Sequence, residues 1–99
     1  MLFVKVIKSY RDVVAICDSD LIGKNFEEGK FQLEVKDSFF RGEETNEEKA
    51  AEIIRKMVQE DATFNIVGKN SVNLALKEGI IKEEGIKMIQ GIPFALVLI

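Results

Sequence analysis

The stretch FNIVGKNSVNLALKEG, residues 64–79, is the part of the sequence that says most about the fold. Its apolar start, FNIV, is typical of a short strand, and Gly68 favours a tight turn at its end. The rest has the apolar spacing of an amphipathic helix from about Asn70 to Glu78, and Gly79 suits the position that follows a helix. We therefore expect a strand, a turn and a helix in direct succession.

The same stretch contains the candidate site. Unpaired N–H groups at a helix N-terminus, together with a lysine, attract anions such as a phosphate, a carboxylate or an RNA backbone. The predicted anion or partner site comprises the residues of this turn and of a second loop, namely Gly68, Lys69, Asn70, Ser71, Lys24 and Asn25. The alternative is structural: Asn70 or Ser71 caps the helix, and Gly68 only makes the turn.

A phosphate-binding loop for nucleotide hydrolysis is not expected at this turn. The pattern GxxxxGK[ST] needs a glycine where this chain has Thr63, and Asn70 separates Lys69 from Ser71. The hydroxyl that would hold magnesium is therefore one residue out of register.

The first half of the chain predicts strands. Residues 2–8 and 13–17 are apolar and are joined by a short polar loop, so we expect an antiparallel hairpin. Residues 19–26 suit a single helical turn or a compact loop. Residues 30–36 alternate, with Phe31, Leu33 and Val35 on one face, which predicts a strand on the open side or edge of the sheet.

The middle of the chain predicts a second helix. After a loop in which Phe39 and Phe40 are interpreted as lids over the core, Thr45 and Glu48 have the spacing of a capping box. It opens a helix over residues 46–61, whose apolar stripe consists of Ala50, Ile53, Ile54, Met57 and Val58.

The chain closes with two strands at IKMI and FALVLI. Because residues 94–99 have no polar side chain, we expect a strand buried on both faces. The predicted fold is a single α+β domain over residues 1–99, with a mixed or mostly antiparallel sheet and two helices packed on one side.

Composition narrows the class of protein. The 99 residues are 46% hydrophobic and 31% charged, which suits one domain that folds alone. No apolar run reaches the roughly 20 residues that span a bilayer, and the start lacks the features of a signal peptide. We expect a cytoplasmic protein without a membrane partner, and the abundance of Lys, Glu and Ile is typical of thermophilic proteins.

Catalytic chemistry has little support. The chain has no histidine and one cysteine, Cys17, in an apolar run, so zinc sites and Ser–His or Cys–His nucleophiles are not expected. Adjacent glutamates are plentiful, but neighbours along a helix or strand point apart. We therefore expect no catalytic residue, no metal and no cofactor, and an enzyme is the less favoured interpretation.

Net charge bears on nucleic-acid binding. The formal net charge is −3, and residues 27–61 carry 11 acidic and 6 basic residues. A protein held on nucleic acid by its overall charge needs lysines and arginines massed on one face. The charge pattern argues against that mode and leaves local basic patches open.

Four blocks, in this order and spacing, carry a resemblance to a known family. They are AICDSDLIGKNFEEGKFQLEV (15–35), FFRGE (39–43), NIVGKNSVNLALKEGII (65–81) and GIPFALV (91–97). The chain resembles the archaeal family of uncharacterised proteins catalogued as domain of unknown function 424. The resemblance implies a small cytosolic α+β protein and, through an association with translation and RNA-handling genes, an informational role. The family pattern often has a histidine after the proline of the closing block, where this chain has Phe94, and this departure also counts against catalysis.

Two hypotheses follow. The first is a non-enzymatic cytosolic interaction module whose partner is RNA, a ribonucleoprotein or another protein. The alternative is a small enzyme or ligand-binding protein that acts on an anionic substrate at the helix after Gly68. A deep pocket with convergent titratable groups favours the second, whereas exposed aromatic residues or a basic stripe favour the first. The oligomeric state stays open.

Overall fold

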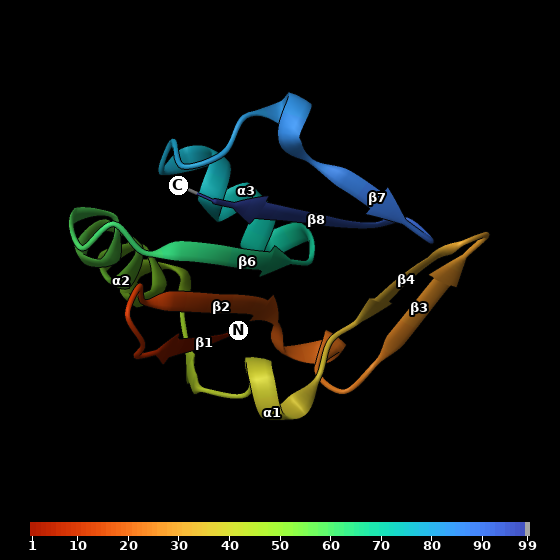
Figure 1. The fold of residues 1–99 in the computed structure, drawn as a ribbon, viewed down its shortest axis with the longest axis horizontal. Coiled ribbons are helices and arrows are strands. Elements are labelled where there is room, and N and C mark those ends of the chain that lie inside the picture. Colours follow the sequence, from red (N-terminus) through yellow and green to blue (C-terminus); the bar gives the residue numbers. More distant parts are fainter. Residues whose placement is uncertain (99) are drawn as a thin grey trace.

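The computed structural model describes residues 1–98, and Figure 1 shows the arrangement of their helices and strands. Two short 3-10 helices, η1 and η2, complete the chain order. The elements are β1 (Leu2–Ile7), β2 (Val13–Asp18), η1 (Ser19–Leu21), β3 (Asn25–Glu28), β4 (Phe31–Glu34), α1 (Asp37–Phe40), β5 (Glu43–Thr45), α2 (Glu47–Gln59), β6 (Thr63–Val67), α3 (Lys69–Lys77), η2 (Glu83–Gly85), β7 (Lys87–Ile89) and β8 (Ile92–Val97).

The main sheet has six strands in the order β5-β1-β2-β6-β8-β7. Its neighbours are antiparallel except for β2 and β6, which run parallel with Cys17 opposite Val67. The predicted α+β class with a mixed sheet is confirmed. The parallel pair places the carboxyl ends of β2 and β6 at the same end of the sheet. The last residue of β2, Asp18, therefore lies beside the start of α3.

Helices α2 and α3 cover one face of this sheet, as the sequence predicted. The cluster under them joins the buried side chains of both helices to those of the strands: Leu2, Val4, Val14, Ile16, Ala50, Ala51, Ile54, Met57, Ala62, Phe64, Ile66, Val72, Leu74 and Ala75. The apolar stripe of α2 is rotated slightly from the predicted one. Ala51 is buried, whereas Val58 is 43% exposed.

The start of α2 differs from the prediction. Asn46 is the N-cap, because its side-chain oxygen accepts a hydrogen bond of 2.9 Å from the Lys49 N–H. Thr45, the predicted cap, lies in β5 opposite Leu2 and is buried. The capping-box spacing was therefore wrong by one residue, because a strand pairing that is distant in sequence takes Thr45 out of the cap position.

The other face of the sheet is covered by elements that the sequence predicted only in part. The strand expected over residues 30–36 is present, but its placement at the open side or edge of the main sheet was wrong, because it pairs with residues 25–28 instead. Residues 25–28 and 31–34 form the separate β3–β4 hairpin, and one turn of helix, α1, follows it. A second cluster lies beneath them, built from Phe3, Ala15, Cys17, Leu21, Val35, Phe40 and Val67. The interpretation of Phe39 and Phe40 as lids is confirmed, and their rings meet edge to face at 5.1 Å.

Strand β8 contradicts the expectation of burial on both faces. Ala95 is buried under the helices, but Leu96 is 58% and Leu98 is 76% exposed, and Ile99 lies outside the described residues. These two leucines lie on the face that the hairpin and α1 cover elsewhere, and the second cluster includes β8 only as far as Phe94. An apolar run alone does not show where the covering layer ends.

Within residues 1–98, no helix is long and apolar enough to cross a bilayer.

Candidate functional site

The turn after β6 meets a buried carboxylate. Asp18 ends β2, and the parallel pairing of β2 with β6 brings it beside Gly68. Its Oδ2 accepts a hydrogen bond of 3.1 Å from the Asn70 N–H, and its Oδ1 accepts bonds of 2.8 Å from the N–H and the Oγ–H of Ser71. Asp18 is only 6% exposed and Ser71 is fully buried.

Asp18 therefore caps α3 from another strand. The N–H groups of Asn70 and Ser71, which could otherwise bind an external anion, already donate to a carboxylate of the chain itself. The negative charge of Asp18 also compensates the positive end of the helix dipole. Gly68 is the N-cap residue with φ 109°, and a Cβ at this position would lie 2.4 Å from the Asp18 Cγ. Glycine is thus required both by the backbone conformation and by the approach of Asp18.

The predicted site residues do not all come together. Lys69 and Asn70 line a depression of about 320 Å³ with Asp18, Asp20, Leu21 and Ile92. An incoming anion would meet two carboxylates there. Lys24 and Asn25 do not line it: Lys24 pairs through its backbone with Leu21 and Val35, and Asn25 begins β3. The structure thus gives the amides of Asn70 and Ser71 an internal acceptor and leaves the exposed Lys69 beside acidic groups.

Metal binding and nucleophilic attack by a cysteine are two kinds of chemistry that depend on how the described side chains are placed. No group of three or more His, Cys, Asp or Glu side chains is placed to hold a metal ion within the part of the chain that the structure covers. Cys17 is buried between the sheet and the hairpin, and burial, followed by the charge of Asp18, raises its pKa to about 12. The thiol therefore stays protonated at neutral pH and is a poor nucleophile.

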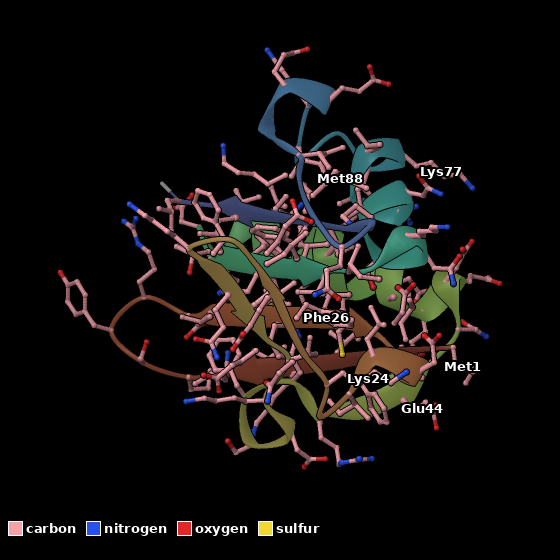
Figure 2. The ribbon with its side chains drawn as sticks, turned by 90° about the vertical axis from the view of Figure 1, so that its right-hand side faces the viewer. Met1, Lys24, Phe26, Glu44, Lys77 and Met88 are labelled. Atoms are coloured by element: carbon pink, nitrogen blue, oxygen red, sulfur yellow. The ribbon has the colours of Figure 1, made fainter. Side chains whose placement is uncertain are left out.

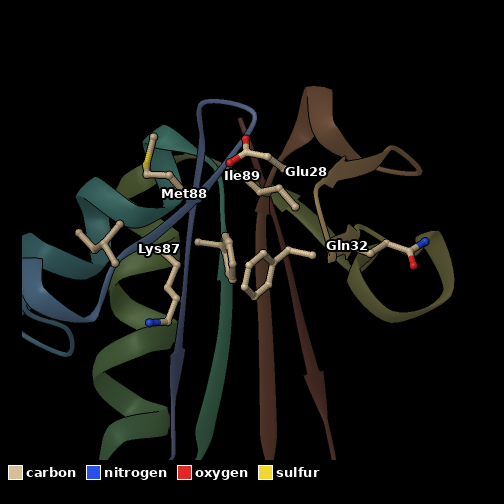
Figure 3. A pocket seen from close by; sticks show the side chains of 8 residues that line it. Glu28, Gln32, Lys87, Met88 and Ile89 are labelled. Atoms are coloured by element: carbon tan, nitrogen blue, oxygen red, sulfur yellow. The ribbon is translucent and has the colours of Figure 1, made fainter.

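A second hollow is better suited to binding. A groove of about 510 Å³ lies between the β3–β4 hairpin and β7 and is lined by Glu28, Phe31, Gln32, Ile86, Lys87, Met88, Ile89 and Phe94. We call this the hairpin groove. Figure 3 shows Gln32 on one side of it and Lys87 and Met88 on the other. Phe31 is 76% and Met88 is 58% exposed, so two large apolar side chains border the groove in contact with solvent.

The two turns at the end of the hairpin groove are joined. The Gln90 N–H donates a hydrogen bond of 2.8 Å to Glu28 Oε1, and the Gln90 side-chain amide donates to the Glu27 carbonyl. The β7–β8 turn therefore holds the tip of the β3–β4 hairpin. Lys24 lies at the base of this hairpin and is well separated from Met88 (Figure 2).

Sequence reasoning missed the hairpin groove. The alternation of residues 30–36 assigned Phe31 to the buried face with Leu33 and Val35. Leu33 and Val35 do turn inward, whereas Phe31 is 76% exposed at the hairpin groove. No local signal marks its exposure, because the exposure depends on how far the hairpin tip projects past β8.

A family described as "Protein of unknown function (DUF424)" matches residues 7–99. The chain belongs to the DUF424 family. The predicted family membership is therefore confirmed, and this match spans the hairpin groove, the Asp18 cap and both helices.

A solved structure shares the fold. The crystal structure of an uncharacterized conserved protein from Methanopyrus kandleri is similar with a TM-score of 0.85 and 24% identity, covering 98% of this chain and 91% of that chain. At that identity the similarity shows a shared fold and nothing further. No curated protein matches the chain.

Proposed function

We propose that the chain is a non-enzymatic interaction module, and that a partner protein docks in the hairpin groove. The observation that carries this proposal is that Phe31 and Met88, two large apolar residues, both line a defined groove and are both exposed to solvent. Large aromatic and sulfur-containing side chains are enriched in the cores of protein interfaces, and solvent-exposed ones that border a pocket are the usual anchors.

The charges support a protein partner rather than RNA. Four of the 14 basic side chains pair closely with acids, at 3.2 Å for Lys8–Asp12, 2.7 Å for Arg41–Asp37, 2.7 Å for Lys49–Glu43 and 2.8 Å for Arg55–Glu78. The hairpin groove itself contributes one lysine and one glutamate. Binding to RNA depends on basic groups that neutralise phosphates, and the hairpin groove does not concentrate such groups.

The alternative of an enzyme acting on an anion at α3 has less support. Two of its N-terminal donors, the N–H groups of Asn70 and Ser71, are satisfied by Asp18, and Asp20 adds a second carboxylate to the depression. The groups that would convert a substrate do not converge there. An interaction module therefore accounts for the geometry with fewer requirements.

The experiment compares two exposed aromatic residues in pull-downs from an archaeal lysate. Phe31→Ser removes the groove anchor, and Tyr10→Ser, in the loop between β1 and β2, is the matched control because Tyr10 is also fully exposed. We expect a stoichiometric protein to be captured by the wild type and by Tyr10→Ser, lost with Phe31→Ser, and retained after nuclease treatment. Equal capture by both variants would refute the groove, and loss on nuclease treatment would favour RNA instead.

A further inference from the structure

Strand β7 forms one wall of the hairpin groove and one edge of the main sheet. It pairs only with β8, so its other side has no neighbouring strand within the described chain. An open strand edge presents backbone N–H and C=O groups that can pair with another polypeptide. Which of these groups point outward follows from the register.

The β7–β8 turn sets the hydrogen-bonding pattern. Gln90 and Gly91 both have positive φ, at 50° and 76°, as in a two-residue type I′ turn. In such a hairpin the residues that flank the turn, Ile89 and Ile92, form a hydrogen-bonded pair, and the next pair, Met88 with Pro93, is a non-hydrogen-bonded pair. The N–H and C=O of Met88 therefore point away from β8, toward the open edge.

An independent contact supports this assignment. The Pro93 carbonyl accepts a hydrogen bond of 2.8 Å from the Gly68 N–H, on the β6 side of β8. Successive residues of a strand alternate the direction of their backbone groups, so Pro93 faces β6 and does not bond to Met88. Proline also has no N–H to offer.

We propose that the hairpin groove binds an extended segment of a partner polypeptide, which adds as a further strand to β7 and exchanges backbone hydrogen bonds with Met88. This inference rests on the proposed function and specifies the class of partner. Main-chain pairing supplies part of the affinity in such complexes, and pockets for alternate side chains supply the specificity. Here the pocket beside the edge has a mixed lining, in which Phe31, Phe94 and Ile86 are among the apolar residues.

A single extended segment fits better than a second copy of this chain. The β7 ladder covers three residues, too short to form most of a dimer interface, which needs roughly 1,200 Å² or more of buried surface. The hairpin also stands on the other side of the groove, with Glu28, Phe31 and Gln32 lining it. A strand added along the open edge of β7 would lie beside this groove, and alternate side chains of that strand could enter the pocket.

The test uses proline, which removes one N–H. Met88→Pro deletes an outward-pointing donor that the β7–β8 ladder does not use, and proline is tolerated on strand edges. Met88→Ala is the first control, because it shortens the same side chain and keeps the N–H. Leu96→Pro is the second, because the same alternation points the Leu96 N–H outward beyond the last β7–β8 pair, at Phe94, and thus away from the groove.

The probe is a phage-displayed heptapeptide library with alternating apolar and polar positions, selected on the wild-type chain. For the best synthetic peptide we expect Met88→Pro to raise the Kd at least tenfold relative to Met88→Ala, with Leu96→Pro close to wild type. Hydrogen exchange should show a fast Met88 amide in the free protein that becomes protected on binding. Circular dichroism and melting curves confirm that each variant is folded.

The outcomes separate the two proposals. Equal affinity of Met88→Pro and Met88→Ala, with binding still lost in Phe31→Ser, overturns strand addition and leaves the interaction module standing. Binding unaffected by Phe31→Ser overturns both. The failure of any peptide to be selected overturns strand addition, whereas the interaction module is then decided by the pull-down with Phe31→Ser. A larger loss with Leu96→Pro than with Met88→Pro moves the strand to β8 and also overturns the assignment to β7.

Discussion

At the scale of single residues, the contact between Asp18 and Gly68 decides how β2, β6 and α3 meet. Asp18 supplies the side-chain acceptor that the N-cap residue, a glycine, cannot supply. The Gly68 carbonyl accepts from the Val72 N–H, so it needs no donor from the facing Pro93. Proline at position 93 therefore costs no hydrogen bond, although it lies inside the sheet.

Gly68→Ala tests this contact. We expect a loss of at least about 2 kcal/mol in the free energy of unfolding, because alanine is strained at φ 109° and its Cβ would overlap the Asp18 carboxyl group. Urea unfolding measures the loss. In the double variant with Asp18→Ala the overlap disappears. The double variant should therefore lose less stability than the sum of the losses measured for the two single variants. Strict additivity would show that the carboxyl group does not cause the strain.

Cys17 tests the burial of the second cluster. With a pKa near 12, the thiol should resist iodoacetamide at pH 8 in the folded protein and react readily in urea. The folded pKa lies above the ordinary value of 9.0, so the unfolded chain loses the proton first and stability should fall as the pH rises from 9 to 12. Below pH 9 the group contributes no pH dependence. Labelling of the native protein at the unfolded rate would contradict its burial.

At the scale of elements, helix starts and strand ends depend on their neighbours. Asn46 rather than Thr45 caps α2, because Thr45 pairs with Leu2 in the sheet. Leu96 is exposed although its strand is wholly apolar, because the covering layer stops short of it. Both differences arise where an element that is remote in sequence is present or absent.

Asn46→Ala should cost about 1 kcal/mol of stability, because it removes the acceptor for the Lys49 N–H at the start of α2. Asn46→Asp keeps an acceptor and adds a charge that the helix dipole favours, so it should be neutral or slightly stabilising. Denaturation monitored by circular dichroism distinguishes the two. An unchanged midpoint in the alanine variant would place the functional cap at another residue.

At the scale of the whole molecule, two sheets share one core and meet again at their tips. The hairpin and α1 close the second face of the main sheet, and Gln90 joins the β7–β8 turn to Glu28 and the backbone of Glu27. This link spans more than 60 residues of sequence and sets the position of the hairpin against β7. The shape of the hairpin groove therefore depends on it.

Glu28→Ala should loosen this link without unfolding the protein. We expect the Gln90 amide to exchange several-fold faster, while global stability changes by less than about 1 kcal/mol, since the hydrogen bond is exposed. Glu84→Ala, on η2, is the matched control for removing an exposed acidic side chain. Hydrogen exchange with residue resolution measures the effect, and an unchanged Gln90 rate would show that the bond does not hold the hairpin tip.

The sequence by itself determined the α+β class, the β1–β2 hairpin, the strand-turn-helix unit around Gly68 and the family, because local periodicity, glycine positions and motif order carry those features. It also drew attention to Gly68, Lys69, Asn70 and Ser71. Only the tertiary structure showed that the amides of Asn70 and Ser71 have an internal acceptor, because Asp18 is about 50 residues away and reaches them through a parallel pairing.

The hairpin groove could not be predicted from the sequence for the same reason. Phe31 and Met88 are ordinary apolar residues in their own segments, and their exposure across a shared groove exists only once two separate sheets are placed against each other. Which backbone groups of β7 face outward likewise depends on its register with β8. Local sequence determines what an element is, whereas contacts between distant elements determine which of its surfaces remain open.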